Sequence, residues 1–391
     1  MVTGWKQSFL GDIITFQRGF DLPLKNRKEG NIPIVSSAGV TDFHDRHAIS
    51  YPTVITGRYG TIGKLFFINS PCWPLNTTLY INNFNGNDIK FIYYFLNKID
   101  FHSFSDKSGV PGINRNDLHM ELVEYPISIS EQQAIAAALS DVDELLRSLD
   151  QLIAKKKDIR LATMQELFTG KTRLPGFQIS SSFQRTETGT IPGDWCFSSF
   201  GDIITKIVGG GTPKRDTPEF WEGDIPWATV KDFANFCPDK TQEYITPKGV
   251  SSSATHVISA GTLIIATRMA LGKTALYNVD VAINQDLKAI IFNQNIDTKF
   301  MHCWFKWQEK NIQYLGSGST VQGISINLLK KISIAIPSLA EQQAIASVLS
   351  DMDAEIEALE ARRDKVRHIK AGMMQELLTG KTRLISSGEG A

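Results

Sequence analysis

Three Gly-Lys-Thr triplets are the residues of this chain that most resemble a catalytic motif, because the triplet ends the phosphate-binding loop of many nucleotide-hydrolysing enzymes. They lie at 170–172, 272–274 and 380–382. That loop also requires a glycine five residues before the Gly-Lys pair, whereas this chain has Gln165, Thr267 and Gln375 there. All three triplets therefore fail as nucleotide-binding motifs. Two of them stand where a glycine would end a helix.

Other signatures of catalysis are also missing from the sequence. There is no Pro-Pro dipeptide, so the Asn/Asp-Pro-Pro-aromatic motif of amino-group methyltransferases is absent, and no Gly-x-Gly-x-x-Gly follows a strand pattern. His44 and His47 have no third metal ligand nearby, and the four cysteines lack Cys-x-x-Cys spacing. We therefore predict no catalytic residue, no metal and no cofactor, and a chain that is not an enzyme by itself.

Cationic and polar side chains gather in loops between short apolar segments. Such side chains bond phosphates and base edges in protein–DNA complexes. Ordinary solvated loops are the competing interpretation for any one of them. The predicted DNA-binding residues are Arg58, Tyr59, Lys107, Asn114, Arg115, Lys214, Arg215, Lys231, Arg268 and Lys273.

The chain repeats itself, and this repeat sets the architecture. Residues 131–174 return at 341–384 (341 − 131 = 210), with 23 of the 44 aligned positions identical. A weaker repeat relates Trp5 and Gly11–Thr15 to Trp195 and Gly201–Thr205 (201 − 11 = 190). Each half therefore reads as one variable globular domain followed by one constant helix, and the two copies predict a pseudo-two-fold repeat.

The repeated segments carry an apolar seam at 3–4 residue spacing that predicts a coiled coil. Ser130 and Gln133 fit a capping box, whereas the second copy has Ala340 at the cap, so its cap is weaker or lies at Ser338. A helix of about 30 residues spans ~45 Å. An antiparallel pair within one chain would place the domains at opposite ends, and a homodimeric coiled coil is the alternative. The seam residues are Leu139, Val142, Leu146, Leu149, Ile153, Leu349, Met352, Ile356, Leu359, Val366 and Met373.

Polar residues at the helix ends are identical in the two copies, although many seam residues between them changed. If the repeat served helix packing alone, we would expect the seam residues to be identical in the two copies and the polar end residues to differ. An identical surface presented twice suits two copies of one partner. The predicted partner-binding residues are Gln132, Gln133, Gln165, Glu166, Gln342, Gln343, Gln375 and Glu376.

Composition describes an ordinary soluble protein with 42% hydrophobic residues and zero net charge. No apolar run approaches the ~18 residues of a membrane span, no signal peptide is evident, and a cytoplasmic location is expected. The fold class predicted is α+β, with two strand-rich domains separated by two long helices in an antiparallel coiled coil. Two similar but non-identical domains at a fixed separation suit duplex DNA. Residues 1–129 carry 12 basic and 11 acidic residues, so a partner is expected to supply further phosphate contacts.

The repeated motifs resemble the conserved regions of specificity subunits of type I restriction–modification enzymes. The resemblance rests on Pro-x-x-x-x-Glu-Gln-Gln-x-Ile at 126–135 with its copy at 337–345, and on the Thr-Gly-Lys-Thr-Arg-Leu endings at 169–174 and 379–384. Gly189–Trp195, at the opening of the second variable domain, also resembles the family. Recognition loops vary widely in this family, so the resemblance transfers no base-contacting residue.

The resemblance implies target-recognition domains at 1–125 and 175–336, conserved helical regions at 126–174 and 337–384, and a tail at 385–391. Each domain would read one half of a bipartite site in double-stranded DNA, and the helices would act as a ruler for the spacer. Two methyltransferase subunits would bind the helices, and restriction subunits would translocate and cleave DNA. S-adenosylmethionine, ATP and Mg would belong to those partners. The competing functions are a coiled-coil scaffold without a DNA role and a stand-alone nuclease or methyltransferase.

Overall fold

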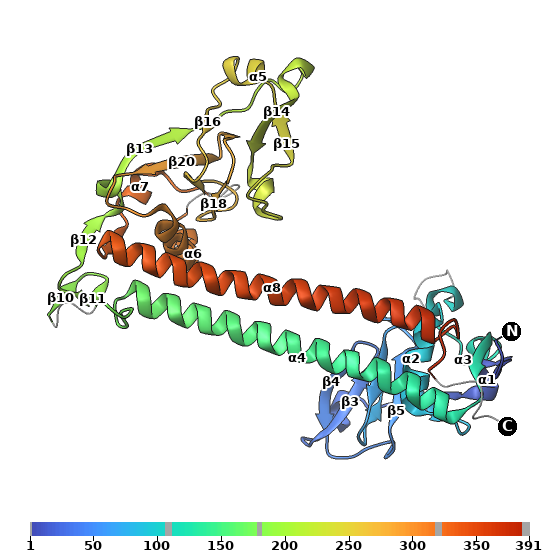
Figure 1. Ribbon diagram of the computed structural model, residues 1–391. Coiled ribbons are helices and arrows are strands. Elements are labelled where there is room, and N and C mark those ends of the chain that lie inside the picture. The colour runs from blue at the N-terminus through green and yellow to red at the C-terminus, as the bar shows by residue number, and fades with distance from the viewer. Residues whose placement is uncertain (1, 106–111, 178–181, 317–322, 385–391) are drawn as a thin grey trace. The chain divides into compact units, whose positions relative to one another are not determined.

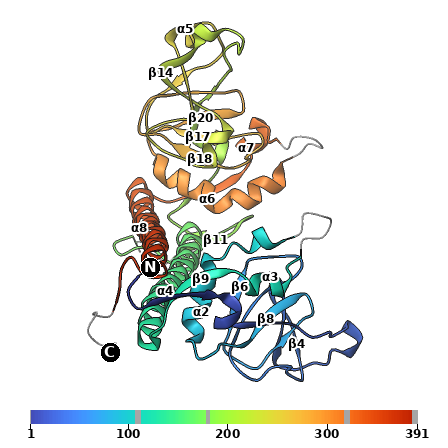
Figure 2. The same cartoon turned by 90° about the vertical axis from the view of Figure 1, so that its right-hand side faces the viewer.

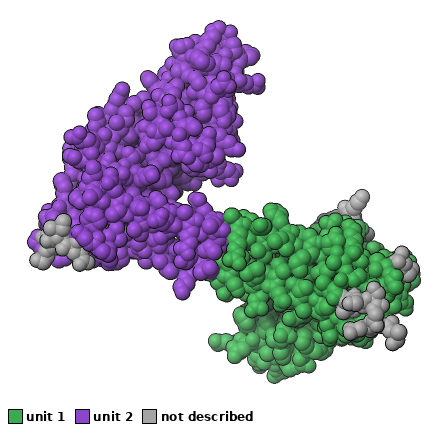
Figure 3. All heavy atoms as spheres, viewed as in Figure 1, with its two compact units in different colours: residues 1–151, 360–391 green, residues 152–359 purple. Residues whose placement is uncertain are grey.

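The computed structural model describes residues 2–105, 112–177, 182–316 and 323–384, and it confirms the predicted mixture of helices with two strand-rich domains. The chain forms two compact units (Figure 3). Unit 1 comprises residues 1–151 and 360–391, and unit 2 comprises residues 152–359. Each unit therefore contains one strand-rich domain together with part of both long helices.

Unit 1 is built around one antiparallel sheet with the strand order β2-β8-β5-β6. A second sheet, β4-β3-β7, contains a parallel pair of β3 and β7, and β1 pairs with β9. The elements are β1 (Trp5–Phe9), α1 (Leu10–Ile13), β2 (Thr15–Arg18), β3 (Ile32–Ser36), β4 (Gly39–His44), β5 (Thr53–Gly57), β6 (Leu65–Ile68), β7 (Trp73–Pro74), β8 (Thr78–Asn83), α2 (Ile89–Phe95), α3 (Arg115–His119) and β9 (Leu122–Pro126).

Unit 2 repeats this plan with the sheets β13-β20-β17-β18, β15-β14-β19-β16 and β12-β21, and adds a hairpin of β10 and β11. Here the parallel pair is β14 with β19. The elements are β10 (Phe183–Thr186), β11 (Gly189–Pro192), β12 (Cys196–Ser199), β13 (Ile204–Gly209), β14 (Trp221–Ala228), β15 (Glu243–Ile245), α5 (Pro247–Ser251), β16 (Val257–Ile258), β17 (Leu263–Ala266), β18 (Thr274–Leu276), β19 (Val281–Ile283), β20 (Leu287–Phe292), α6 (Thr298–Leu315), α7 (Ile326–Lys330) and β21 (Ser333–Ile336).

One helix covers the main sheet in each unit. Helix α2 packs on β5 and β6, and α6 packs on β17 and β18 (Figure 2). Both helices start at an aspartate cap, because Asp88 accepts a hydrogen bond from the Phe91 amide and Asp297 accepts one from the Phe300 amide. Phe91 and Phe300 are fully buried in the two cores. The sequence repeat thus extends through the variable domains as well as the helices.

The two long helices are α4 (Ile129–Phe168) and α8 (Leu339–Leu377), with 40 and 39 residues (Figure 1). They are longer than the predicted 30 residues and end as predicted, since Gly170 and Gly380 adopt positive φ angles of 66° and 71°. The predicted cap at Ser130 is wrong. Helix α4 begins at Ile129, so its cap lies two residues earlier, at Ser128, which accepts the hydrogen bond from the Glu131 amide at 3.4 Å.

The two helices pair in an antiparallel manner within each unit, which confirms the prediction of an intramolecular pair. In unit 1, Lys370 of α8 forms an ion pair with Asp143 of α4, with Nζ 2.6 Å from Oδ1. In unit 2, Arg160 of α4 donates to Asp353 of α8 at 2.9 Å. Seam residues such as Leu139 and Leu349 are fully buried. In both units the beginning of one helix therefore lies against the end of the other.

Two further observations bear on the function classes. None of the helices in the described part of the chain is long and apolar enough to cross a membrane. His44 is buried, and its Nδ1 accepts a hydrogen bond from the Lys28 amide at 3.1 Å. Its ring also packs on Trp73, with the ring centroids 5.4 Å apart. His44 therefore has a structural role in the core of unit 1.

Candidate nucleic-acid interface

A tight turn enters the central strand of the main sheet in each unit. In unit 1 the turn spans Leu75–Thr78 before β8, and the Thr78 amide donates to the Leu75 carbonyl at 2.9 Å. In unit 2 the turn spans Asn284–Leu287 before β20, and the Leu287 amide donates to the Asn284 carbonyl at 3.3 Å. Both turns follow a strand that pairs in parallel, β7 or β19. The two turns are therefore structurally equivalent.

A second loop is hydrogen-bonded to each turn by the same backbone contact. The Arg58 amide donates to the Thr77 carbonyl at 2.8 Å, and the Thr267 amide donates to the Asp286 carbonyl at 2.9 Å. Residues 58–64 of unit 1 then correspond one by one to residues 267–273 of unit 2. Both have a glycine with positive φ at the sixth position, 78° at Gly63 and 76° in its counterpart Gly272. The same loop geometry is thus built twice.

Two more segments complete the frame. The Phe20 amide donates to the Pro74 carbonyl at 2.8 Å in unit 1, and the Gly211 amide donates to the Ile283 carbonyl at 3.0 Å in unit 2. Residues 112–113 and 323–324 close the other side, since the amides of Ile113 and Ile324 donate to the carbonyls of residues 58 and 267 at 2.9 and 3.0 Å. We call this arrangement the corner: residues 19–21, 58–64, 75–78 and 112–113 in unit 1, and 210–212, 267–273, 284–287 and 323–324 in unit 2.

The corner keeps its backbone and changes its side chains between the two units. The four backbone hydrogen bonds described above occur in both units, whereas most side chains compared at the corner differ. Position 60 in unit 1 is a glycine with φ of 82°, whereas its counterpart Met269 adopts φ of 63° with 69% of its surface exposed. A methionine in this conformation costs about 1–2 kcal/mol relative to the right-handed region. The corresponding side chains, unit 1 first, are Asp21 and Thr212, Arg58 and Thr267, Tyr59 and Arg268, Asn76 and Gln285, and Thr77 and Asp286.

Several predicted DNA-binding residues of unit 1 lie at or beside the corner. The Arg58 guanidinium stacks on the Tyr59 ring, 4.7 Å from its centroid, and Tyr59 is 39% exposed. Asn114 caps α3, because its side chain accepts a hydrogen bond from the Asn116 amide at 3.0 Å. Arg115 is exposed at the first position of that helix. Lys107 lies outside the described residues.

The predicted residues of unit 2 fall into two groups. Arg268 and Lys273 belong to the corner and are exposed, and an Arg268 nitrogen lies 3.7 Å from the Asp286 carboxylate. Lys214, Arg215 and Lys231 lie instead beside the other sheet, β15-β14-β19-β16. Arg215 also lies 5.0 Å from the ring centroid of Trp227, whose indole donates to the Gly211 carbonyl of the corner.

Arg215 makes contacts within its own domain although its side chain is 53% exposed. Its guanidinium donates to the Glu243 carboxylate, with one contact at 3.1 Å, and lies 4.0 Å from the ring centroid of Trp221. The bond to Glu243 raises the pKa of Arg215. Lys214 lies 3.5 Å from Asp216, and Lys231 is exposed. Arg215 therefore contributes to the packing of unit 2.

A buried ion cluster closes each unit at the helix ends, and sequence analysis missed it. In unit 2 the Glu341 carboxylate accepts hydrogen bonds from Arg173, one at 2.7 Å, and from the Trp195 indole at 3.2 Å. In unit 1 the Glu131 carboxylate accepts from Arg383, one bond at 2.6 Å, and from the indole of residue 5 at 3.3 Å. We call these the clasps. Hydrogen bonding to Glu341 raises the pKa of Arg173, and Arg173 in turn lowers the pKa of Asp194.

Two predicted partner-binding residues are internal, so that prediction is wrong for them. Gln132 is fully buried: its Oε1 accepts from the Asp88 amide at 2.8 Å and its Nε2 donates to the Pro126 carbonyl at 2.9 Å. Gln342 makes the equivalent contacts with the Asp297 amide and the Pro337 carbonyl. These glutamines fasten the start of each long helix to α2 or α6, which explains why they are identical in both copies.

The other predicted partner-binding residues remain at the surface. The side chains of four glutamines are exposed and make no hydrogen bond within the described parts of the chain: Gln133, Gln165, Gln343 and Gln375. Glu166 accepts a hydrogen bond from Thr172 at 3.0 Å, and Glu376 accepts one from Thr382 at 3.1 Å. No packing contact accounts for the identity of the four glutamines.

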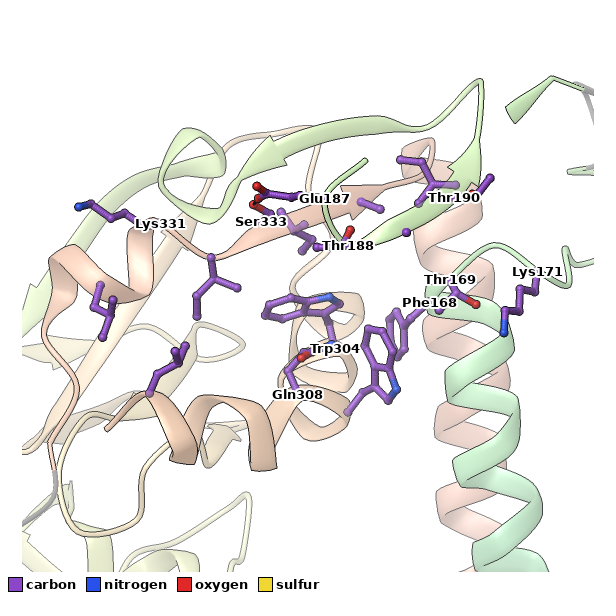
Figure 4. Close-up of a pocket in the computed structure, with 18 residues that line it drawn as sticks. Phe168, Thr169, Lys171, Glu187, Thr188, Thr190, Trp304, Gln308, Lys331 and Ser333 are labelled. Atoms are coloured by element: carbon purple, nitrogen blue, oxygen red, sulfur yellow. Dashed lines mark hydrogen bonds between the residues drawn. The ribbon is translucent and has the colours of Figure 1, made fainter. Parts of the chain in front are cut away.

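Unit 2 also contains a groove of about 720 Å³ between the β10–β11 hairpin, β21 and α6 (Figure 4). Trp304 and Phe168 line its interior, and Lys171 and Lys331 lie on opposite sides of it. Ser333 of β21 donates a hydrogen bond to Glu187 in the hairpin turn. The groove contains none of the predicted DNA-binding residues. The corner therefore remains the candidate interface.

Comparison with known proteins agrees with this architecture. A family model described as Type I restriction modification DNA specificity domain matches residues 3–156 and 192–368. The chain is 32% identical over 186 residues to the type I restriction enzyme MjaIX specificity subunit of Methanocaldococcus jannaschii, covering 46% of this chain and 43% of that protein. It is 35% identical over 157 residues to the Escherichia coli EcoR124I/EcoR124II specificity subunit, covering 38% and 39%. These matches thus span less than half of either relative.

Solved structures share the fold at low sequence identity. The S subunit of a type I restriction–modification system from M. genitalium aligns with a TM-score of 0.65 and 16% identity, covering 95% of this chain and 96% of that one. A chain from a structural study of complex assembly and conformational transition of the type I R-M system aligns with a TM-score of 0.56 and 18% identity, covering 96% and 97%. The chain belongs to the family of type I restriction modification DNA specificity domains.

Proposed function

We propose that this chain is the non-catalytic DNA-specificity subunit of a type I restriction–modification complex, and that each unit reads one half of a bipartite DNA target. The corner is the single observation that carries the proposal. Sequence-specific readout requires side chains that vary on a backbone that holds them still. The corner has both properties, because the same backbone hydrogen bonds hold two different sets of exposed side chains.

The chemistry of the solvent-accessible corner residues fits base readout; three of them are exposed, and Arg58 and Asn76 are half-buried. Arg58, Tyr59, Asn76, Arg268 and Gln285 offer guanidinium, aromatic and carboxamide groups, which pair with guanine, stack on bases or pair with adenine. Different residues at equivalent positions would read different half-sites. This difference distinguishes a specificity subunit from a coiled-coil scaffold without a DNA role, which would have no reason to vary an otherwise repeated corner.

Partner subunits complete the proposed assembly. Each predicted domain is close to neutral, so most phosphate contacts must come from elsewhere. We assign this role to two methyltransferase subunits, each of which binds one helix-end surface. The surface of unit 1 is formed by Gln133, Gln375 and Glu376, and that of unit 2 by Gln165, Glu166 and Gln343. Restriction subunits join that core. S-adenosylmethionine, ATP and Mg belong to these partners.

The test is selection of DNA from a duplex library randomised over about 30 bp by the complex of this chain with its methyltransferase. The proposal expects enrichment of two specified blocks separated by an unspecified spacer. Enrichment of one contiguous block, or of no sequence, would contradict it. Binding that falls steeply with added salt but enriches no sequence would show that the complex contacts phosphates without reading the sequence, which also contradicts the proposal.

A further inference from the structure

We propose that Asn76 and Gln285 each recognise an adenine, one in each half-site. The inference rests on the proposed DNA readout and adds to it the residues and the base. It starts from the equivalent positions of the two residues, since both are the second residue of the turn that enters the central strand, β8 or β20. Gln285 is exposed and Asn76 is half-buried, and most other side chains compared in the corner change chemical type between the units. This position keeps a carboxamide in both.

Each carboxamide forms a hydrogen bond with a side chain from the segment 19–21 or 210–212 of the corner. In unit 1 the Asn76 Nδ2 donates to the Asp21 carboxylate, which in turn accepts a hydrogen bond from Arg18 at 3.3 Å. Because a carboxylate can only accept, this contact fixes which way the amide of Asn76 points. In unit 2 the Thr212 hydroxyl donates to the Gln285 Oε1. Asp21 and Thr212 are themselves equivalent residues of the corner.

These contacts leave the hydrogen-bonding groups that adenine requires. Asn76 retains one Nδ2 hydrogen and its Oδ1, and Gln285 retains both Nε2 hydrogens and one lone pair of Oε1. The side chains of Asn76 and Gln285 make no other hydrogen bond within the described parts of the chain. Each amide is therefore oriented by one bond and still offers a donor beside an acceptor.

Adenine presents the complementary pair in the major groove, with N7 as acceptor and the N6 amino group as donor. Asparagine and glutamine form two hydrogen bonds with this edge. An arginine or lysine can only donate and pairs with guanine instead. The carboxamide position in the corner thus defines one A·T base pair in each half-site.

The sharpest test is the substitution Gln285→Glu in the complex with the methyltransferase, assayed by selection from the randomised duplex library. A carboxylate can still accept the Thr212 hydroxyl, so the local contact is kept, but the donor to adenine N7 is lost. Glutamate accepts from the cytosine amino group. We expect one adenine of the second half-site to lose about 5- to 150-fold in preference and to change towards cytosine. All positions of the first half-site should stay unchanged.

Gln294→Glu is the matched control, because Gln294 is an exposed glutamine of unit 2 outside the corner and receives the same charge change. Asn76→Ala provides the independent arm and should weaken one adenine of the first half-site only. If the wild-type complex enriches a bipartite motif and Gln285→Glu leaves it unaltered, or alters a G·C position, this inference is overturned while the proposed function stands. If the wild-type complex enriches nothing, the proposed function itself fails.

Discussion

Disrupting the clasps should lower the unfolding free energy by different amounts in the two units. Glu341 is 1% exposed, and its carboxylate accepts hydrogen bonds from Arg173 and Trp195. Hydrogen bonds to charged groups contribute about 1.5–3 kcal/mol each. Glu341→Gln keeps the shape and one acceptor but loses the charge and the second acceptor. Unit 2 should therefore lose about 2–3 kcal/mol of unfolding free energy.

The first copy should lose less for the same change. The Arg173 side chain is 8% exposed, whereas that of Arg383, its counterpart in unit 1, is 27% exposed. Water can therefore solvate Arg383 in part when its carboxylate partner is replaced. Glu131→Gln should cost about 1–2 kcal/mol. Asp194 also bonds Arg173, at 3.0 Å, and this bond keeps the Glu341→Gln cost below the ~3–5 kcal/mol of a fully unpaired buried charge.

Urea unfolding followed by circular dichroism and tryptophan fluorescence measures these differences. Trp195 lies in the clasp of unit 2 and is one of the seven tryptophans that contribute to the fluorescence signal. Glu357→Gln is the matched control, since Glu357 is exposed on α8, and it should shift stability by less than about 0.5 kcal/mol. The reasoning is refuted if Glu341→Gln costs no more than the control, or if Glu131→Gln costs more than Glu341→Gln.

Three further predictions follow from the corner, the helix-end surface and the helices. Arg268→Ala should cost about 1–3 kcal/mol of DNA affinity and relax one position of the second half-site. Arg215→Ala should instead lower unfolding stability and leave the selected motif intact. Titration of selected duplexes and thermal melting distinguish these two effects. Reversing the charge of Glu166 and Glu376 together should release both methyltransferase subunits from a folded chain, and native mass spectra that retain both would rule the surface out. Inserting seven residues into both α4 and α8 adds ~10 Å of helix and should lengthen the spacer by about 3 bp; an unchanged spacer would exclude the ruler.

Features governed by local sequence could be predicted correctly. The antiparallel helices follow from two matched apolar seams on one chain, and the helix ends follow from Gly170 and Gly380. The helix start was misplaced because serines at 128 and 130 both satisfy the local capping pattern. Ser128 caps the helix that begins at Ile129.

Features governed by distant contacts could not be predicted from one sequence. Gln132 looks like a surface residue on a helical wheel, but it is buried by Asp88 and Asn87, which precede it by more than forty positions. Arg215 looks like a free loop cation until Glu243 is brought beside it. The identical polar helix ends were read as one partner surface, whereas part of that identity belongs to the internal glutamines and the clasps.

The corner was within reach of the sequence but was missed. The shared Gly-Lys pairs at 63–64 and 272–273 define an offset of 209 (272 − 63 = 209) between the loops. Applied to the turn, the same offset pairs Asn76 with Gln285. Residue type alone would pair Asn76 with Asn284, whereas the backbone hydrogen bonds of the two turns pair it with Gln285.

The most direct test of the account is a domain exchange read out by methylation. Residues 1–125 are replaced with the corresponding domain of a relative, and the methylated motif is determined by genome-wide sequencing of cells that also produce the methyltransferase. If the two units read DNA independently, we expect a new sequence in one half-site, with the other half-site and the spacer unchanged. A motif in which both half-sites change together would contradict the account.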